Sequence, residues 1–159
     1  MQQLITSLNL KPHPEGGYFS EVFRSEHQVC SPQNGKSRNA MTHIYFLLLA
    51  GQKSRFHCVA HDEVWNFYAG APLRLHHIRN NQPLTESQSV ACDTIEIGNS
   101  PHFAHVINAG HWQAAESTGE YSLVGCSVAP GFDFEDFRFM NKAEADWLSV
   151  HQPAWSPFV

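Results

Sequence analysis

The sequence predicts an all-β protein with one short helix at each end. Short apolar segments separated by turn residues recur through 41–131 at spacings near ten residues. Strands at intervals of about 8–12 residues are typical of a β-sandwich or β-barrel, whereas α/β folds alternate strands with helices. Helical spacing of apolar residues is confined to the first eight residues and to 141–152. We therefore expect a single domain, 1–159, with a long β-run between two helices.

The N-terminal third begins with the first of these helices. Residues 2–8 place three apolar side chains at helical spacing, and Pro12 and Pro14 end the pattern. The residue before a proline is pushed toward an extended backbone, which a helix does not tolerate. Residues 18–25 alternate two sets of side chains and predict a strand. Residues 30–39 contain Pro, Asn, Gly and Ser without periodicity, and they predict a loop.

The rest of the chain is predicted to form repeated strands and a closing helix. The continuous apolar run in 41–51 predicts a buried strand, because its length and its bounding glycine fit one. In the C-terminal tail, Asn141 and Glu144 form a capping-box pattern, and Pro153 ends the helix. The further predicted strands occupy 64–70, 71–81, 89–98, 102–110, 111–117 and 121–131.

Composition excludes several classes of protein. The formal net charge of −5 gives no basic footprint, so nucleic acid is not an expected partner. The longest apolar run, 44–50, is far shorter than the roughly 20 residues of a membrane helix. The N-terminus has no cationic start or apolar core of a secretory signal, and the four cysteines include no C-x-x-C pair. These features predict a cytoplasmic protein with reduced thiols and no membrane partner.

The stretch from Gly51 to Gly70 resembles the first conserved motif of cupin proteins, G-x5-H-x-H-x3-E-x6-G. His57 and Glu63 stand at the first histidine and glutamate positions, and both glycines match. Val59 occupies the position of the second histidine. A β-strand points alternate residues the same way, so the two histidines of such a motif face into one pocket. The usual metal chemistry of that pocket is therefore in doubt.

A divalent metal ion is one cofactor that the pocket could hold. His57, Glu63 and Gln113 are the candidate ligands, since Gln113 stands where the second cupin motif has its histidine. An amide oxygen binds metals more weakly than an imidazole does, and two imidazoles are lost from the four ligands of the usual site. His61 shares strand parity with His57, but the motif places a turn there. We expect His61 to be a partly solvated turn residue.

The same pocket could instead bind a small organic molecule. Trp65 and Phe67 share strand parity with Glu63, which would give an aromatic-walled site with a histidine and a carboxylate. These aromatic side chains could equally fill a small barrel. If Tyr121 faces inward, it makes an acid–base pair with His57. Glu15, before a Gly-Gly pair, is predicted to be part of a turn that starts the first strand.

Four blocks together point to one family. They are HPEGGYFSEVFRS at 13–25, DEVWNFYAGAPLRL at 62–75, GHWQAA at 110–115 and YSLVGCSVAPGFDFEDF at 121–137. With the strand IYFLL, they resemble the type-5 cupin-like family of unknown function. The resemblance implies a double-stranded β-helix, the cupin jelly-roll barrel, which forms dimers and has a ligand-sized cavity. Glutamine in the GHWQ block is a trait of that family.

These residues are compatible with three functional hypotheses. Two of them are enzymes and one is not, so the sequence leaves open whether the protein is an enzyme. The first is a metal-independent isomerase or epimerase-like enzyme with His57 as base and Glu63 orienting it. The cupins of the sugar-nucleotide epimerase type use such a base, with a tyrosine as acid. The second is a metal-dependent enzyme at His57, Glu63 and Gln113. The third is a non-catalytic module that binds a small ligand. A homodimer is expected, because pairing between subunits protects exposed sheet edges.

Overall fold

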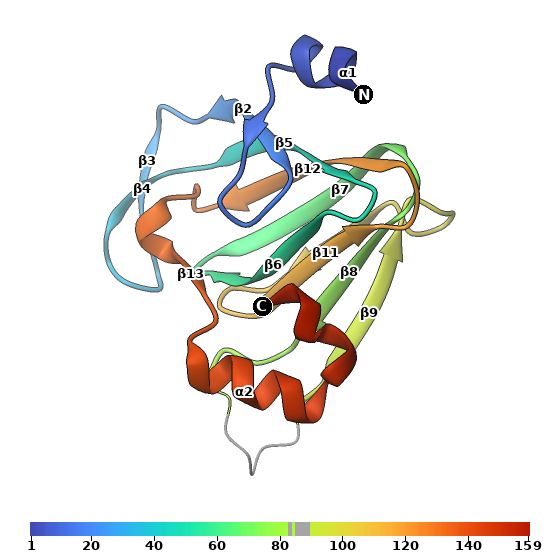
Figure 1. Cartoon of the computed structure of the whole chain (residues 1–159). Coiled ribbons are helices and arrows are strands. Elements are labelled where there is room, and N and C mark those ends of the chain that lie inside the picture. The colour runs from blue at the N-terminus through green and yellow to red at the C-terminus, as the bar shows by residue number, and fades with distance from the viewer. Residues whose placement is uncertain (83, 85–89) are drawn as a thin grey trace.

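The structure is a computed structural model that describes residues 1–82, 84 and 90–159. Two antiparallel β-sheets face each other, and short helices lie at both ends of the chain (Figure 1). The prediction of an all-β fold with a helix at each end is confirmed. In spatial order, the six-stranded sheet comprises β1 (Lys11–Pro12), β2 (Tyr18–Arg24), β5 (Thr42–Leu49), β12 (Tyr121–Ala129), β7 (Asp62–Gly70) and β10 (Ala104–Ile107). The five-stranded sheet comprises β13 (Phe137–Phe139), β6 (Lys53–Val59), β11 (Trp112–Ser117), β8 (Leu73–Ile78) and β9 (Cys92–Ile97).

One element differs from the expectation from sequence, and one expected strand begins outside the described residues. The expected loop at 30–39 overlaps a short hairpin of β3 (Gln28–Cys30) and β4 (Ser37–Asn39). Each of its strands has only three residues, too few for alternation to be recognisable. The predicted strand at 89–98 corresponds to β9, and its first residue, Ser89, lies outside the described residues.

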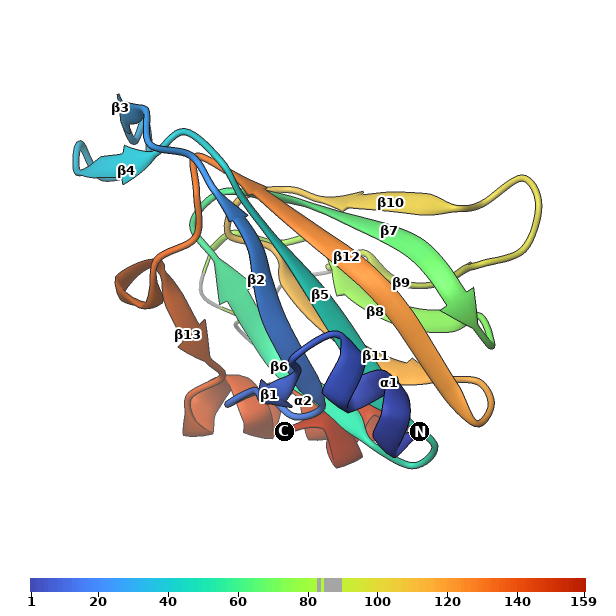
Figure 2. The ribbon, with the colours of Figure 1, turned by 90° about the horizontal axis from the view of Figure 1, so that it is seen from above.

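The long apolar run of β5 is explained by burial on both faces of its sheet. Successive strand residues point to opposite faces. Phe46 is 1% exposed and packs between the two sheets, whereas its neighbour Leu47 is fully buried on the outer face. Helix α1 (Gln2–Ser7) covers that outer face with Leu4 and Ile5 (Figure 2). A strand covered on both sides needs apolar residues at consecutive positions, which hides the usual alternation.

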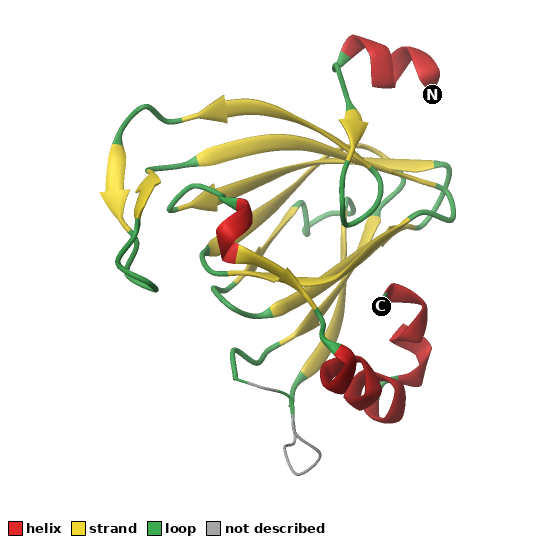
Figure 3. Cartoon of the chain, turned by 60° about the vertical axis from the view of Figure 1, so that its left-hand side comes forward, coloured by secondary structure: helices red, strands yellow, loops and turns green. Residues whose placement is uncertain are grey.

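The C-terminal helices cover the outer face of the five-stranded sheet (Figure 3). Helix α2 (Lys142–His151) begins with the expected capping box, in which Asn141 and Glu144 each accept the other's backbone N–H. The 3₁₀ segment η2 (Pro153–Phe158) follows and adds Trp155 and Phe158 to the apolar contact. Within the described ranges, no helix is long and apolar enough to cross a membrane.

Three histidines meet between the sheets, away from the residues expected at the functional site. His77 of β8 lies with its Nε2 2.9 Å from Nδ1 of His111, and its ring is 5.7 Å from that of His105 on β10. Burial lowers the pKa of His77 to about 4, and the two neighbouring imidazoles and Arg79 add to the effect. The cluster therefore stays uncharged at neutral pH.

We expect this histidine cluster to make the fold sensitive to acid. An unfolded chain protonates His77 near pH 6.5, whereas the folded protein does so only near pH 4. Between these values the unfolded state binds more protons, so the free energy of unfolding falls as pH falls. His77→Gln should reduce that fall by about 1–2 kcal/mol at pH 5 relative to pH 7. Urea unfolding of both proteins at the two pH values measures it, and equal pH slopes would contradict the assignment.

Candidate functional site

A cavity of about 260 Å³ opens between the two sheets beside β2 and β5. Side chains of both sheets reach it, together with the turn before β2 and the segment 132–137. Its lining comprises His13, Glu15, Phe19, Glu21, Arg24, Thr42, Ile44, Phe46, His57, Val59, Glu63, Cys126, Val128, Phe132, Asp133, Phe134 and Phe137. The lining therefore divides evenly between apolar or aromatic side chains and ionisable ones, with the hydroxyl of Thr42 in addition.

Glu15 reaches the cavity from a tight turn between β1 and β2. The turn is closed by backbone hydrogen bonds from His13 N–H to the Gly17 carbonyl and from Gly16 N–H to the His13 carbonyl. The Glu15 carboxyl then accepts a 2.8 Å hydrogen bond from the Ser54 hydroxyl, and its other oxygen lies 3.3 Å from His57 Nε2. The sequence HPEGG thus builds a turn that directs a carboxyl at the histidine of β6.

His57 is fixed in one tautomer by its backbone contact. Its Nδ1 lies 2.7 Å from the carbonyl oxygen of Arg55, and a carbonyl only accepts hydrogen bonds. Nδ1 therefore carries a proton, and Nε2 is the atom that exchanges one with Glu15. The ring of Phe137 stacks on the imidazole at 5.2 Å and shields it from water. His57 is 2% exposed, so the exchanging nitrogen faces the cavity and not the solvent.

Glu63 approaches the cavity from β7, in the sheet opposite His57. Gln113 donates a 2.6 Å hydrogen bond to one carboxyl oxygen, and the Gln113 carbonyl accepts a 2.8 Å bond from the Trp65 indole. An indole N–H only donates, so this chain sets which way the Gln113 amide points. The Cys126 thiol also hydrogen-bonds the carboxyl of Glu63. The contacts with Gln113 and Cys126 thereby fix the position of the Glu63 carboxyl.

Burial shifts the proton affinities of these groups toward each other. Desolvation raises the pKa of both Glu15 and Glu63, and repulsion between the two carboxyls contributes at Glu63. Desolvation lowers the pKa of His57, although the nearby Glu63 carboxyl opposes it. A carboxyl with a raised pKa and an imidazole with a lowered one exchange a proton at a smaller free-energy cost than exposed groups do, which favours general acid–base chemistry.

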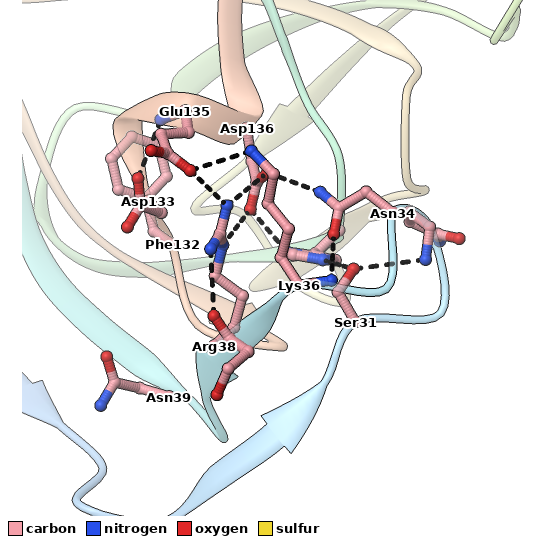
Figure 4. A network of polar contacts seen from close by, with 12 residues as sticks. Ser31, Asn34, Lys36, Arg38, Asn39, Phe132, Asp133, Glu135 and Asp136 are labelled. Atoms are coloured by element: carbon pink, nitrogen blue, oxygen red, sulfur yellow. Dashed lines mark hydrogen bonds and ion pairs between the residues drawn. The ribbon is translucent and has the colours of Figure 1, made fainter.

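The outer wall of the cavity is held in place by the β3–β4 hairpin (Figure 4). Arg38 donates to both oxygens of Asp136, at 2.6 and 3.0 Å. Asn34 donates to the same carboxyl at 2.8 Å, and Lys36 pairs with Glu135 at 3.0 Å. Phe134 and Phe137 flank these acids in the chain and line the cavity. The hairpin therefore positions the aromatic wall of the cavity.

The structure brings together some of the residues expected at the site and separates others. His57 and Glu63 both line the cavity. Gln113 is fully buried behind Glu63, and Trp65 and Phe67 face the space between the sheets but pack into the core. Tyr121 lies on the outer face of the six-stranded sheet among side chains that α1 covers. The acid–base pair of Tyr121 with His57 is therefore not assembled, since the two side chains lie on opposite sides of the sheet.

His61 is in the expected turn between β6 and β7, but the expectation that it is partly solvated is wrong. It is 1% exposed, and its Nε2 lies 2.7 Å from the hydroxyl of Ser31. The β3–β4 hairpin folds over it, with Asp136 3.8 Å from its Nδ1. Burial beneath a segment distant in sequence is the reason that strand parity could not place it.

Two other parts of the site are not apparent from sequence patterns. The pattern around Glu15 predicts only a turn, although a Gly-Gly pair after a carboxylate does allow the backbone to approach a neighbour closely. Gly16 has φ of 115°, and Lys53 of β6 lies directly against it. The aromatic wall from Phe132 to Phe137 has no periodic signal. After a Pro-Gly pair, phenylalanines alternate with acidic residues, and this pattern is the one local sign that the loop contributes to a site.

We expect the hydrogen-bond chain behind Glu63 to contribute strongly to stability. Gln113→Leu leaves the Trp65 N–H and the Glu63 carboxyl without their partner inside the core. Because each unsatisfied buried group costs about 1–3 kcal/mol, the free energy of unfolding should fall by roughly 2–4 kcal/mol. A double-mutant cycle with Trp65→Phe, followed by urea unfolding, should show coupling. Strictly additive losses would contradict this role of the chain.

The donor set does not fit a cupin metal centre. Val59 lines the cavity where the motif has its second histidine, and the amide oxygen of Gln113 is occupied by Trp65. Among the described residues, no group of three or more His, Cys, Asp or Glu side chains has the arrangement of a metal site. The candidate ligands His57, Glu63 and Gln113 thus offer one imidazole and one carboxylate toward the cavity.

Comparison with known proteins agrees with the architecture. A model of a family described as Cupin superfamily (DUF985) matches residues 2–140. An uncharacterized protein of Saccharomyces cerevisiae is 31% identical over 155 residues, covering 88% of this chain and 75% of the relative. A hypothetical protein from Leishmania major has a solved structure with a TM-score of 0.82 and 32% identity, covering 99% of this chain and 95% of the other.

The fold itself extends to more distant structures. A Klebsiella pneumoniae protein with a double-stranded β-helix domain has a TM-score of 0.55 at 14% identity, covering 87% of this chain and 95% of the other. This similarity supports the double-stranded β-helix expected from sequence, in the form of two facing sheets. The family model, which matches most of the sequence, makes the assignment: the chain is a member of the cupin superfamily, in the family described as DUF985.

Proposed function

We propose that this protein is a metal-independent isomerase-type enzyme that moves a proton on a small polar organic molecule. The observation that carries the proposal is the pairing of His57 Nε2 with the buried carboxyl of Glu15 at 3.3 Å inside the cavity. The imidazole is oriented by the Arg55 carbonyl, and Glu63 faces the same space from the other sheet. Ionisable groups on two sides of a bound molecule suit proton removal and return.

The chemistry requires no co-reactant. His57 Nε2 takes a proton from a carbon next to a carbonyl, and the electrons of that bond move to the carbonyl oxygen, which gives an enolate. A facing carboxylic acid then delivers a proton to the other face of the same carbon and the carbonyl re-forms, after which His57 and the carboxylate regain their starting protonation by exchange with water. Where that carbon carries a hydroxyl, the hydroxyl proton can instead move through a carboxyl to the first carbonyl oxygen, while the proton held by His57 adds to the former carbonyl carbon. Glu15 shares the proton with His57 in both steps. The net result is an isomer of the substrate, with all atoms and electrons conserved.

The cavity also limits the size and kind of substrate. Its volume of about 260 Å³ is below the roughly 300 Å³ at which sites for drug-sized ligands begin, so a molecule no larger than a monosaccharide fits best. Three arginines that could bind a pyrophosphate are engaged with other groups instead. Arg24 pairs with Glu21, Arg55 lies over the ring of Phe139, and Arg74 pairs with Glu96. A nucleotide-linked sugar is therefore a poor candidate.

Deuterium incorporation tests the proposal before the substrate is identified. A metabolite extract is incubated with the protein in D₂O, returned to H₂O and measured by mass spectrometry. Only deuterium fixed on carbon survives the return, so at least one metabolite should gain mass with wild-type protein. Tyr121→Phe should behave as wild type, because Tyr121 lies outside the cavity. A complete lack of incorporation would contradict an isomerase and leave ligand binding as the function.

Metal analysis addresses the metal-dependent alternative at His57 and Glu63. We expect untagged protein to contain less than one metal ion per chain, in an amount unchanged in His57→Ala and Glu63→Ala. The reason is that the described residues present no three-ligand group. Elemental mass spectrometry of the three proteins measures the content. One equivalent of metal in wild type, lost in both variants, would overturn the metal-independent mechanism.

A further inference from the structure

We infer that the molecule bound in this cavity is an organic cation, such as a primary or quaternary ammonium compound. The inference rests on the proposed function for the site and names the class of its substrate. Two features carry it: a corner of phenylalanine rings at one wall, and an excess of carboxyl groups over cations in the rest of the lining.

The three phenylalanines of segment 132–137 form this aromatic corner. The ring centroids of Phe132 and Phe134 are 5.0 Å apart, and that of Phe137 lies 6.0 and 6.1 Å from them. The planes are inclined by 69 to 82°, so the rings stand nearly at right angles to one another. Several aromatic faces around one space are the arrangement that binds quaternary and methylated ammonium groups. All three rings line the cavity, where one face of Phe137 lies on the His57 imidazole and one face of Phe134 is turned toward that of His13.

The charges around the cavity are unbalanced in the same direction. Four carboxyl side chains line it against one guanidinium, with the two histidines uncharged at neutral pH because burial lowers the pKa of each. The titratable and charged groups facing it are His13, Glu15, Glu21, Arg24, His57, Glu63, Cys126 and Asp133. An anion entering this space would meet repulsion, and a cation would be attracted.

The single guanidinium of the lining does not offset this excess, because its own hydrogen bonds hold it at the rim. Arg24 donates to both carboxyl oxygens of Glu21, at 3.0 and 2.8 Å. Its remaining donors reach the amide oxygen of Asn39 at 2.9 Å and the carbonyl of Phe132 at 3.2 Å. Arg24 therefore neutralises Glu21, also faces the Asp133 carboxyl and supports the aromatic corner. This leaves Glu15 and Glu63 without a permanent cation in the lining, although Arg55 lies near Glu15 from outside it.

A bound cation would also stabilise the ionised forms of two buried carboxyls. Desolvation raises the pKa of Glu15 and of Glu63, so each takes up a proton more readily than an exposed carboxyl does. A positive charge nearby favours their ionised forms, so binding should release protons to the solvent. Affinity should accordingly increase as pH rises through the range in which these carboxyls titrate. A neutral ligand would produce neither effect.

Matched pairs of probes test the inference directly. Choline is compared with 3,3-dimethylbutan-1-ol, and cyclohexylamine with cyclohexanol, so that each pair shares a shape and differs in charge. Calorimetry at pH 7, in two buffers of different ionisation heat, gives affinity and proton release. We expect at least one cation to bind tenfold or more tightly than its neutral partner and to release protons. Failure of both cations to exceed their neutral partners would overturn the inference.

Variants of the cavity show whether the preference arises there. Glu15→Gln and Glu63→Gln should each reduce the preference for the cation by fivefold or more. Phe134→Leu should weaken cation binding, while Phe103→Leu serves as its control, since the two rings are 56% and 53% exposed and only Phe134 lines the cavity. If a glutamine variant does not fold, the comparison of Phe134→Leu with Phe103→Leu still tests whether the preference for the cation arises in the cavity. A preference unchanged in every cavity variant would contradict the assignment.

The two proposals fail separately. Cation preference without deuterium incorporation would keep the ligand class and remove the isomerase, leaving a binding protein. Deuterium incorporation into neutral metabolites alone, with no cation preference, would keep the isomerase and remove the ligand class.

Discussion

His57→Ala is expected to lower the rate of deuterium incorporation at least about 100-fold, the usual contribution of a general base. The alanine removes an imidazole whose Nε2 faces a cavity carboxyl at 3.3 Å while its Nδ1 is fixed by a backbone carbonyl at 2.7 Å. Glu15 and Glu63 would remain, but neither is oriented by the Arg55 carbonyl. The rate is measured with whichever metabolite incorporates deuterium in the wild-type protein.

His76→Ala is the matched control for this substitution. His76 lies on β8 of the same sheet and is 4% exposed, against 2% for His57, so both substitutions remove a buried imidazole. His76 packs against Trp155 and Phe158 on the outer face of that sheet and does not line the cavity. Equal loss of activity in both variants would mean that His57 acts through stability alone.

Gly16→Ala is expected to displace Glu15 and to destabilise the fold. Gly16 has φ of 115°, a conformation that L-residues rarely adopt, and a Cβ there would collide with the Lys53 carbonyl oxygen. Backbone strain of this kind costs about 1–3 kcal/mol, and the collision adds to it. The turn must move away from β6, which separates the Glu15 carboxyl from His57 and Ser54. Urea unfolding and the deuterium assay measure the two effects.

Gly35→Ala is the control that distinguishes the effect of the collision at Gly16 from the effect of backbone strain. Gly35 also has a positive φ, of 72°, but a Cβ there would have no atom within 4 Å. Its substitution should cost only the conformational strain and should leave proton transfer unchanged. If Gly16→Ala and Gly35→Ala lose the same stability and neither affects activity, the close contact of the turn with β6 has no role in the site.

Local patterns are enough to predict the helices and the succession of strands in this chain. The helix caps, turn residues and strand spacing are encoded in neighbouring residues, as Asn141 with Glu144 shows. The family resemblance then supplies the double-stranded β-helix, and His57 and Glu63 follow from a motif whose spacing reflects one strand pair. The homodimer and the cytoplasmic location stay predictions.

The rest of the site depends on contacts between distant segments, which spacing does not reveal. Glu15 meets His57 because a turn 42 positions earlier in the sequence packs against β6, as the Arg55 N–H to Glu15 carbonyl bond shows. Phe137 stacks on His57 from β13, 80 positions later, through pairing of β13 with β6. Tyr121 illustrates the converse, since apolar neighbours on both of its strand faces leave its direction undetermined by parity.

A measurement of the protonation state of His57 tests most directly the claim that this histidine accepts a proton from a bound molecule. Nitrogen NMR of ¹⁵N-histidine-labelled protein, assigned by comparison with His57→Gln, reports the tautomer and the pKa of this one ring among eleven. We expect a proton on Nδ1 and a pKa below 6.5, since burial disfavours the imidazolium. A proton on Nε2 in the neutral form, or a pKa above 6.5, would contradict a histidine poised to accept a proton from a bound molecule.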